Sequence, residues 1–98
     1  MEHLTIYFKH GIQDIVPYTD FIMKIKAELH SNGLGQYLGD DMAIDGVDAE
    51  VVFSCVSANE LFEYIKVDLA NLPFMQGAKI TFTFGELESS TPVKEFYL

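Results

Sequence analysis

Residues 49–65 read AEVVFSCVSANELFEYI, and this stretch decides the fold. Its first part, from Ala49 to Val56, is almost continuously apolar, which is typical of a central strand that is buried on both faces of a sheet. Ser57 and Glu60 follow with the spacing of a capping box, in which the serine hydroxyl accepts the N–H of Glu60 at the start of a helix. The stretch therefore predicts a central strand that leads directly into a helix.

Two amphipathic helices are predicted, one earlier in the chain than the central strand and one directly after it. The first covers 17–32, with Pro17 in its first turn and Gly33 as its left-handed cap. The second covers 57–72 and ends before Pro73. Because each helix has one apolar face, both are expected to cover the same side of a sheet. The apolar faces consist of Tyr18, Phe21, Ile22, Ile25 and Leu29 in the first helix and Leu61, Phe62, Ile65, Leu69 and Leu72 in the second.

The remaining segments have the patterns of strands. Apolar and polar residues alternate over 4–9, 79–86 and 93–98, and the glycine-rich, acidic segment 36–45 is typical of a bent edge strand with a bulge. The order of elements predicts an α+β fold of the ferredoxin-like βαββαβ type, with an antiparallel sheet, two helices on one face and an extra C-terminal strand. In that fold 4–9 and 49–56 are central, 36–45 lies at an edge, and the last strand pairs with 79–86.

Length and composition limit the class of protein. Ninety-eight residues, 49% of them apolar, predict one domain over 1–98 with one core, which excludes a two-lobed enzyme. The single cysteine, Cys55, forms no internal disulfide and supplies no multi-thiolate zinc site. The sequence has no recognisable export signal and no apolar run long enough to cross a bilayer. We therefore expect a cytoplasmic protein without a membrane partner.

The acidic residues are concentrated in one segment. Residues 27–65 hold eight acids and no lysine, whereas the rest of the chain has seven acids and six lysines, so eight of the nine net negative charges lie in this segment. Such a charge disfavours nucleic acid and favours a basic protein partner, although a merely solvated, aggregation-resistant edge is the alternative. The predicted partner-binding residues are Asp40, Asp41, Asp45, Asp48 and Glu50, with Tyr37 as an aromatic anchor.

No motif identifies a catalytic, cofactor or metal site, and we expect no enzyme and no cofactor. A calcium loop starting at Asp41 fails because Ala43 and Val52 stand where oxygen ligands are needed. Cys55 has no histidine near it in sequence and is expected to be a small buried apolar residue. The three histidines show no metal-binding spacing and are expected to be partly exposed: His3, His10 and His30.

The segment GLGQYLGDDM at 33–42, followed by Asp45-Gly46, a Val- and Phe-rich strand and a capped helix, resembles small acidic ferredoxin-like proteins of bacteria. Some of these are similar to immunity proteins of contact-dependent inhibition and related toxin systems. The resemblance implies a protein that occludes the active site or substrate surface of a basic nuclease toxin. Two alternatives remain: a homodimeric small-ligand-binding or regulatory domain, and a small dimeric oxygenase or isomerase with a pocket containing a histidine and Tyr7.

Overall fold

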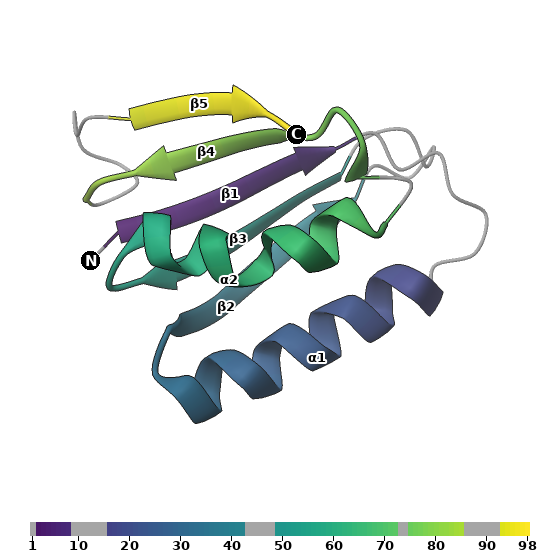
Figure 1. The fold of residues 1–98 in the computed structure, drawn as a ribbon, viewed down its shortest axis with the longest axis horizontal. Coiled ribbons are helices and arrows are strands. Elements are labelled where there is room, and N and C mark those ends of the chain that lie inside the picture. The colour runs from purple at the N-terminus through teal and green to yellow at the C-terminus, as the bar shows by residue number, and fades with distance from the viewer. Residues whose placement is uncertain (1, 9–15, 43–48, 73–74, 86–92) are drawn as a thin grey trace.

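The computed structural model describes residues 2–8, 16–42, 49–72, 75–85 and 93–98 (Figure 1). These residues form five strands and two helices, in agreement with the predicted order of elements. The elements are β1 (Glu2–Phe8), α1 (Val16–Asn32), β2 (Gly35–Met42), β3 (Ala49–Cys55), α2 (Ala58–Ala70), β4 (Lys79–Thr83) and β5 (Val93–Tyr97).

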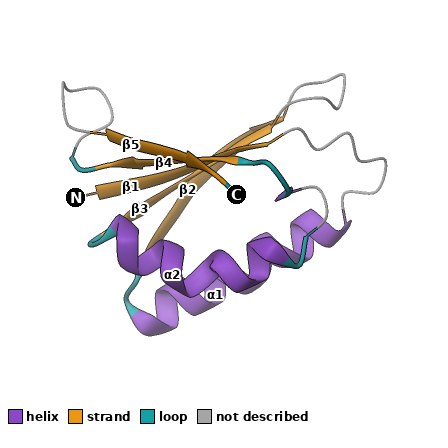
Figure 2. Cartoon of the chain, turned by 45° about the horizontal axis from the view of Figure 1, so that its top comes forward, coloured by secondary structure: helices purple, strands orange, loops and turns teal. Residues whose placement is uncertain are grey.

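The five strands form one antiparallel sheet in the order β2-β3-β1-β4-β5. The two strands predicted to be central, β1 and β3, are interior, and the predicted edge strand β2 lies at an edge. The last strand pairs with β4, as expected. Figure 2 shows both helices on the same side of the sheet. The α+β class is therefore confirmed, with an antiparallel sheet that has one face covered by helices and one face without them.

The core lies between the sheet and the helices. Leu4 and Ile6 of β1 are fully buried, and each stands in register between apolar residues of β3 and β4. All five residues of the predicted apolar face of α1 are buried. On the β5 side, the ring of Phe96 packs edge-on against Phe62 and Phe82, with centroids 5.0 and 5.2 Å apart. These contacts fix the C-terminal strand to α2 and to the sheet.

The start of α2 has the predicted cap and a second one that the sequence did not indicate. The hydroxyl of Ser57 accepts the N–H of Glu60 at 3.3 Å. In addition, the Glu2 carboxylate accepts the N–H of Ala58 at 2.7 Å. A negative charge at a helix N-terminus is stabilising, because the exposed N–H groups carry partial positive charge there. The first residue of β1 is thereby hydrogen-bonded to the first turn of α2.

Strand β3 differs from the prediction. We expected it to be buried on both faces, but only the face towards the helices is fully apolar and buried. On the other face Glu50 is exposed and Val52 is half-buried. The reason is that both helices cover the same face of the sheet, so no helix among the described residues packs on the second face (Figure 2).

The close approach of β2 to β3 at Gly35 can be tested by substitution. A Cβ atom on Gly35 would overlap the carbonyl oxygen of Ser54 in β3. We expect Gly35→Ala to lower the free energy of unfolding by about 2–3 kcal/mol, measured by urea denaturation, because β2 must move away from its neighbour. The control is Gly33→Ala, where φ is +64° and a Cβ meets no atom within 4 Å. Only the backbone cost of about 1 kcal/mol is expected there. Equal losses in the two variants would contradict the close approach at Gly35.

Candidate functional site

The described members of the predicted binding set lie on β2 and β3, and not all on one face of the sheet. Asp40 is opposite Val51, a buried residue that faces the helices, whereas Asp41 is opposite Glu50, which is exposed on the uncovered face. Tyr37 is half-buried on the helix side, opposite Phe53. Asp45 and Asp48 fall outside the described residues. The structure therefore brings Tyr37 and Asp40 together and places Glu50 on the other face.

A bulge in β2 causes this division. The register with β3 shifts between Tyr37 and Gly39, so that Leu38 has no partner of its own. Side chains alternate strictly along a regular strand, and one inserted residue exchanges the two faces for every residue that follows. Leu38 is 50% exposed, and Asp40 points towards α1 rather than away from it. The sequence predicted a bulge in this strand, but not which acids it would turn towards the helix.

Two phenols hold the Asp40 carboxylate. The hydroxyl of Tyr18, a residue of α1 that is 3% exposed, donates to Asp40 Oδ2 at 2.7 Å. Burial and then this bond raise the pKa of Tyr18 far above its usual value. Burial, followed by a hydrogen bond with Asp40, also raises the pKa of Tyr37. In the part of the chain that is described, no lysine forms an ion pair with Asp40. The hydrogen-bond donors to this carboxylate are thus neutral phenols.

The predicted aromatic anchor, Tyr37, is held from two sides. Its ring meets that of Phe53 edge-on, with centroids 5.9 Å apart. The Nζ atom of Lys26 lies 5.0 Å from the ring centroid, a cation–π distance. The ring forms part of the wall of a hollow of about 440 Å³ between α1 and the start of β2. The residues lining this hollow are Lys26, His30, Gly35, Gln36 and Tyr37.

The five described lysines are all engaged by an acid or an aromatic ring. None of their three ion pairs includes an acid of β2 or β3. The ion pairs are Lys24–Asp68 at 2.9 Å, Lys66–Glu63 at 2.6 Å and Lys79–Glu95 at 2.9 Å, while Lys26 and Lys94 lie over Tyr37 and Phe96. The described lysines therefore leave the charge of the β2 edge unneutralised.

The burial of His3 contradicts the prediction from the sequence, whereas the burial of Cys55 agrees with it. His3 was expected to be partly exposed, which is wrong: it is 7% exposed, and its Nδ1 donates to the carbonyl of Gly85 at 2.8 Å. It lies on an interior strand, between Ser54 and Thr83 in register, and both of these are buried too. Cys55 is a free, fully buried thiol, as expected, with its Sγ 3.6 Å from the carbonyl oxygen of Glu2.

Within the described residues, no three side chains of His, Cys, Asp or Glu are close enough together to hold a metal ion. Neither α1 nor α2 is long and apolar enough to cross a membrane, and the described residues contain no other helix of that kind.

Comparison of the chain with protein-family models, with curated proteins and with solved structures finds no match. The resemblance to immunity proteins therefore stays a prediction. Function has to be inferred from the chemistry of the surfaces.

The Tyr18–Asp40 hydrogen bond is expected to stabilise the β2 edge. Tyr18→Phe removes the buried donor to a charged acceptor, and we expect it to lower the free energy of unfolding by about 1–2 kcal/mol in urea denaturation. The control is Tyr64→Phe, which removes a hydroxyl bonded to the Glu28 carboxylate at an exposed position. A smaller loss is expected there, because water replaces the donor. A larger loss for Tyr64→Phe would contradict the role given to Tyr18.

Cys55 is expected to make the fold sensitive to alkaline pH. Burial, and then the charge of Glu2, raise the pKa of Cys55 to about 11 from an ordinary value of 9.0. The folded-state pKa lies above the unfolded one, so the contribution of the protonated thiol is complete below pH 9 and is lost as the pH rises towards 11. Urea denaturation at pH 8.5 and at pH 10 measures this loss, and Cys55→Ala should reduce it. An identical pH dependence in the variant would contradict the assignment.

Proposed function

We propose that this protein is a non-enzymatic, acidic binding protein that docks a basic protein partner along the β2 edge. Its partner on this proposal is a nuclease toxin, which makes it an immunity protein. The observation that carries the proposal is the concentration of carboxylates on one edge of the sheet without a neutralising lysine among the described residues. The strand order β2-β3-β1-β4-β5, with two helices on one face, supports a ferredoxin-like assignment with one added strand.

The basic surface with which a nuclease binds its substrate is complementary in charge to this edge. An enzyme that cleaves nucleic acid presents a basic surface to the phosphates of its substrate. Carboxylates on β2 and β3 would occupy the places of those phosphates and exclude the substrate. Their field also accelerates the encounter with a basic protein, since opposite charges steer association. Asp40 is fixed by its two phenols before binding, so little side-chain entropy is lost when it meets a lysine or an arginine.

The same edge disfavours self-association. An antiparallel pairing of β2 with β2 of a second copy, centred on Asp40 and Asp41, would bring these acids together, and like charges at close range on paired strands are destabilising. The homodimeric alternative therefore needs another surface. A small-ligand-binding or regulatory domain is favoured by a different feature, a hollow on the side of the sheet that includes β4 and β5. We place the protein in the cytoplasm, where a free thiol such as Cys55 stays reduced.

Charge reversal tests the β2 edge. The partner is first identified by affinity purification from the native host, and its nuclease activity is then measured with and without this protein. Replacing Asp41, Asp45, Asp48 and Glu50 with Lys leaves Asp40 in place as the acceptor of Tyr18. We expect this variant to bind the identified partner at least about 100-fold more weakly, and inhibition of the nuclease to fall in parallel.

A matched control variant distinguishes the effect of where the charges lie from the effect of the net charge. Replacing Asp14, Asp20, Glu86 and Glu88 with Lys changes the net charge by the same amount outside residues 27–65. We expect a change in affinity of less than about 5-fold, since long-range steering falls off within a Debye length in physiological salt. Equal losses in the two variants, or unchanged affinity in the first, would rule out the β2 edge as the binding surface. A partner without nuclease activity would rule out the immunity function.

A further inference from the structure

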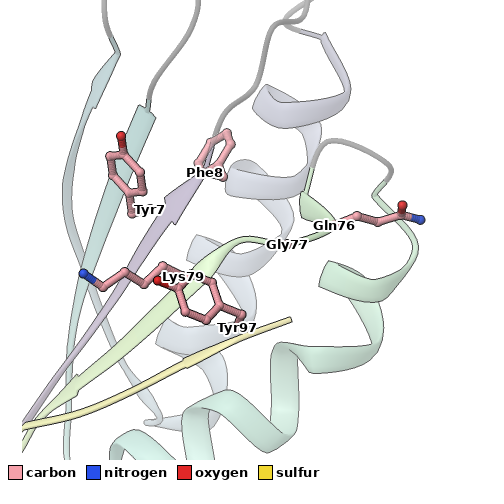
Figure 3. A pocket seen from close by; sticks show the side chains of 6 residues that line it. All are labelled: Tyr7, Phe8, Gln76, Gly77, Lys79 and Tyr97. Atoms are coloured by element: carbon pink, nitrogen blue, oxygen red, sulfur yellow. The ribbon is translucent and has the colours of Figure 1, made fainter.

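A row of three side chains crosses β1, β4 and β5 on the face of the sheet that carries no helices. Tyr7 is in register with Lys79, and Lys79 is in register with Tyr97. Figure 3 shows the three together on one side of the strands, with Phe8 on the other side of β1 and Gln76 pointing away. They border a hollow of about 580 Å³, whose lining we call the tyrosine pocket: Tyr7, Phe8, Gln76, Gly77, Lys79 and Tyr97.

The size and the aromatic walls suit one planar group. Pockets for small molecules range from about 300 to 1,000 Å³. Neighbouring strands lie about 4.8 Å apart, so Tyr7 and Tyr97, which are two strands apart, stand about 10 Å from one another across the stem of Lys79. Tyr7 is 37% exposed and Tyr97 is 71% exposed. A flat ring lying over the lysine stem would cover both aromatic side chains and remove them from water.

The polar groups of the pocket are mainly proton donors. The Lys79 ammonium has three N–H donors, and the ion pair with Glu95 at 2.9 Å uses one of them. The Glu95 carboxylate, and to a smaller extent the phenols of Tyr97 and Tyr7, raise the pKa of Lys79, which places both phenols near the ammonium and keeps it charged. The phenolic hydroxyl of Tyr97 and the remaining N–H groups of Lys79 can therefore donate to one anionic group of a ligand.

We propose that the tyrosine pocket binds a small aromatic carboxylate, with the ring of the ligand between Tyr7 and Tyr97 and its carboxylate on the ammonium of Lys79. A single negative charge fits better than a phosphate, because Glu95 and the net charge of −9 repel a dianion more strongly. The proposal goes beyond the docking of a basic protein. The pocket involves β1, β4 and β5 and the partner surface involves β2 and β3, and the two adjoin where Tyr7 is in register with Glu50.

Titration with benzoate tests the pocket in the intact protein. Binding is followed by ¹H–¹⁵N NMR, and we expect saturable shifts at Gly77, Lys79 and Tyr97 with a Kd of about 1 mM, a normal affinity for so small a ligand. Lys79→Met should weaken binding at least about 10-fold, and Tyr97→Leu by about 5-fold. The control, Lys94→Met, removes a lysine of the neighbouring strand β5 that lies over Phe96. It should leave the Kd within about twofold.

Glu95→Gln gives the sharpest test, because its effect has opposite signs for anions and cations. Removing this carboxylate frees the Lys79 ammonium, so benzoate should bind about 5-fold more tightly. Benzylamine, which has the same ring and a positive charge, should not bind, and cyclohexanecarboxylate, which lacks an aromatic ring, should bind several-fold more weakly than benzoate.

Several outcomes would overturn the proposal. They are weaker benzoate binding in Glu95→Gln, tighter binding of benzylamine or phenyl phosphate than of benzoate, and no saturable shift at about 20-fold above the expected Kd. Failure to find a nuclease partner, in contrast, contradicts only the immunity function.

Discussion

The structure depends on one constraint: the sheet buries a single face, and β1 carries that face through its centre. Leu4 stands between Phe53 and Phe82, and the next inward residue, Ile6, is likewise enclosed by β3 and β4. Each such side chain contributes about 1.5–3 kcal/mol when it leaves water, so the register of this row is strongly determined. Residues on the other face do not have to be apolar, although three polar ones are buried there: His3, Ser54 and Thr83. That freedom permits an acid at Glu50, threonines along the centre and a lysine between two tyrosines.

The sequence predicts much of this arrangement because its signals are local. Alternation in β1 and β4, the cap at Ser57 and the apolar faces of both helices each follow from residues within one element. The position of Asp40 does not follow from residues within one element, for two reasons. Its donor Tyr18 is 22 residues away and belongs to a helix face that a hydropathy pattern treats simply as apolar. Moreover, the bulge after Tyr37 decides which face receives each acid, and glycines mark a bulge without giving its register.

The burial of His3 is a second feature that local sequence patterns could not predict. The alternating pattern places it correctly on the face away from the helices, and polar residues on such a face are usually exposed. Whether a side chain on that face is covered depends on strands that are distant in sequence. His3 has Ser54 on one side and Thr83 on the other, and its ring nitrogen Nδ1 donates a hydrogen bond to the carbonyl of Gly85. The contact joins residues 82 positions apart, so no local signal could have indicated it.

The two edges of the sheet differ in charge, and this difference lets one small domain carry two unlike surfaces. Strand β2 has two acids and no lysine, which also prevents unwanted pairing of this edge with other strands, whereas β5 has one lysine and one acid. Lys79 lies on β4, three strand spacings from β2, or about 14 Å. This exceeds the Debye length of about 8 Å in physiological salt. Glu50 of β3 lies nearer to the tyrosine pocket, since it is in register with Tyr7. The acids of β2 are screened from Lys79 over this distance, so they can attract a basic protein without preventing an anionic ligand from reaching it.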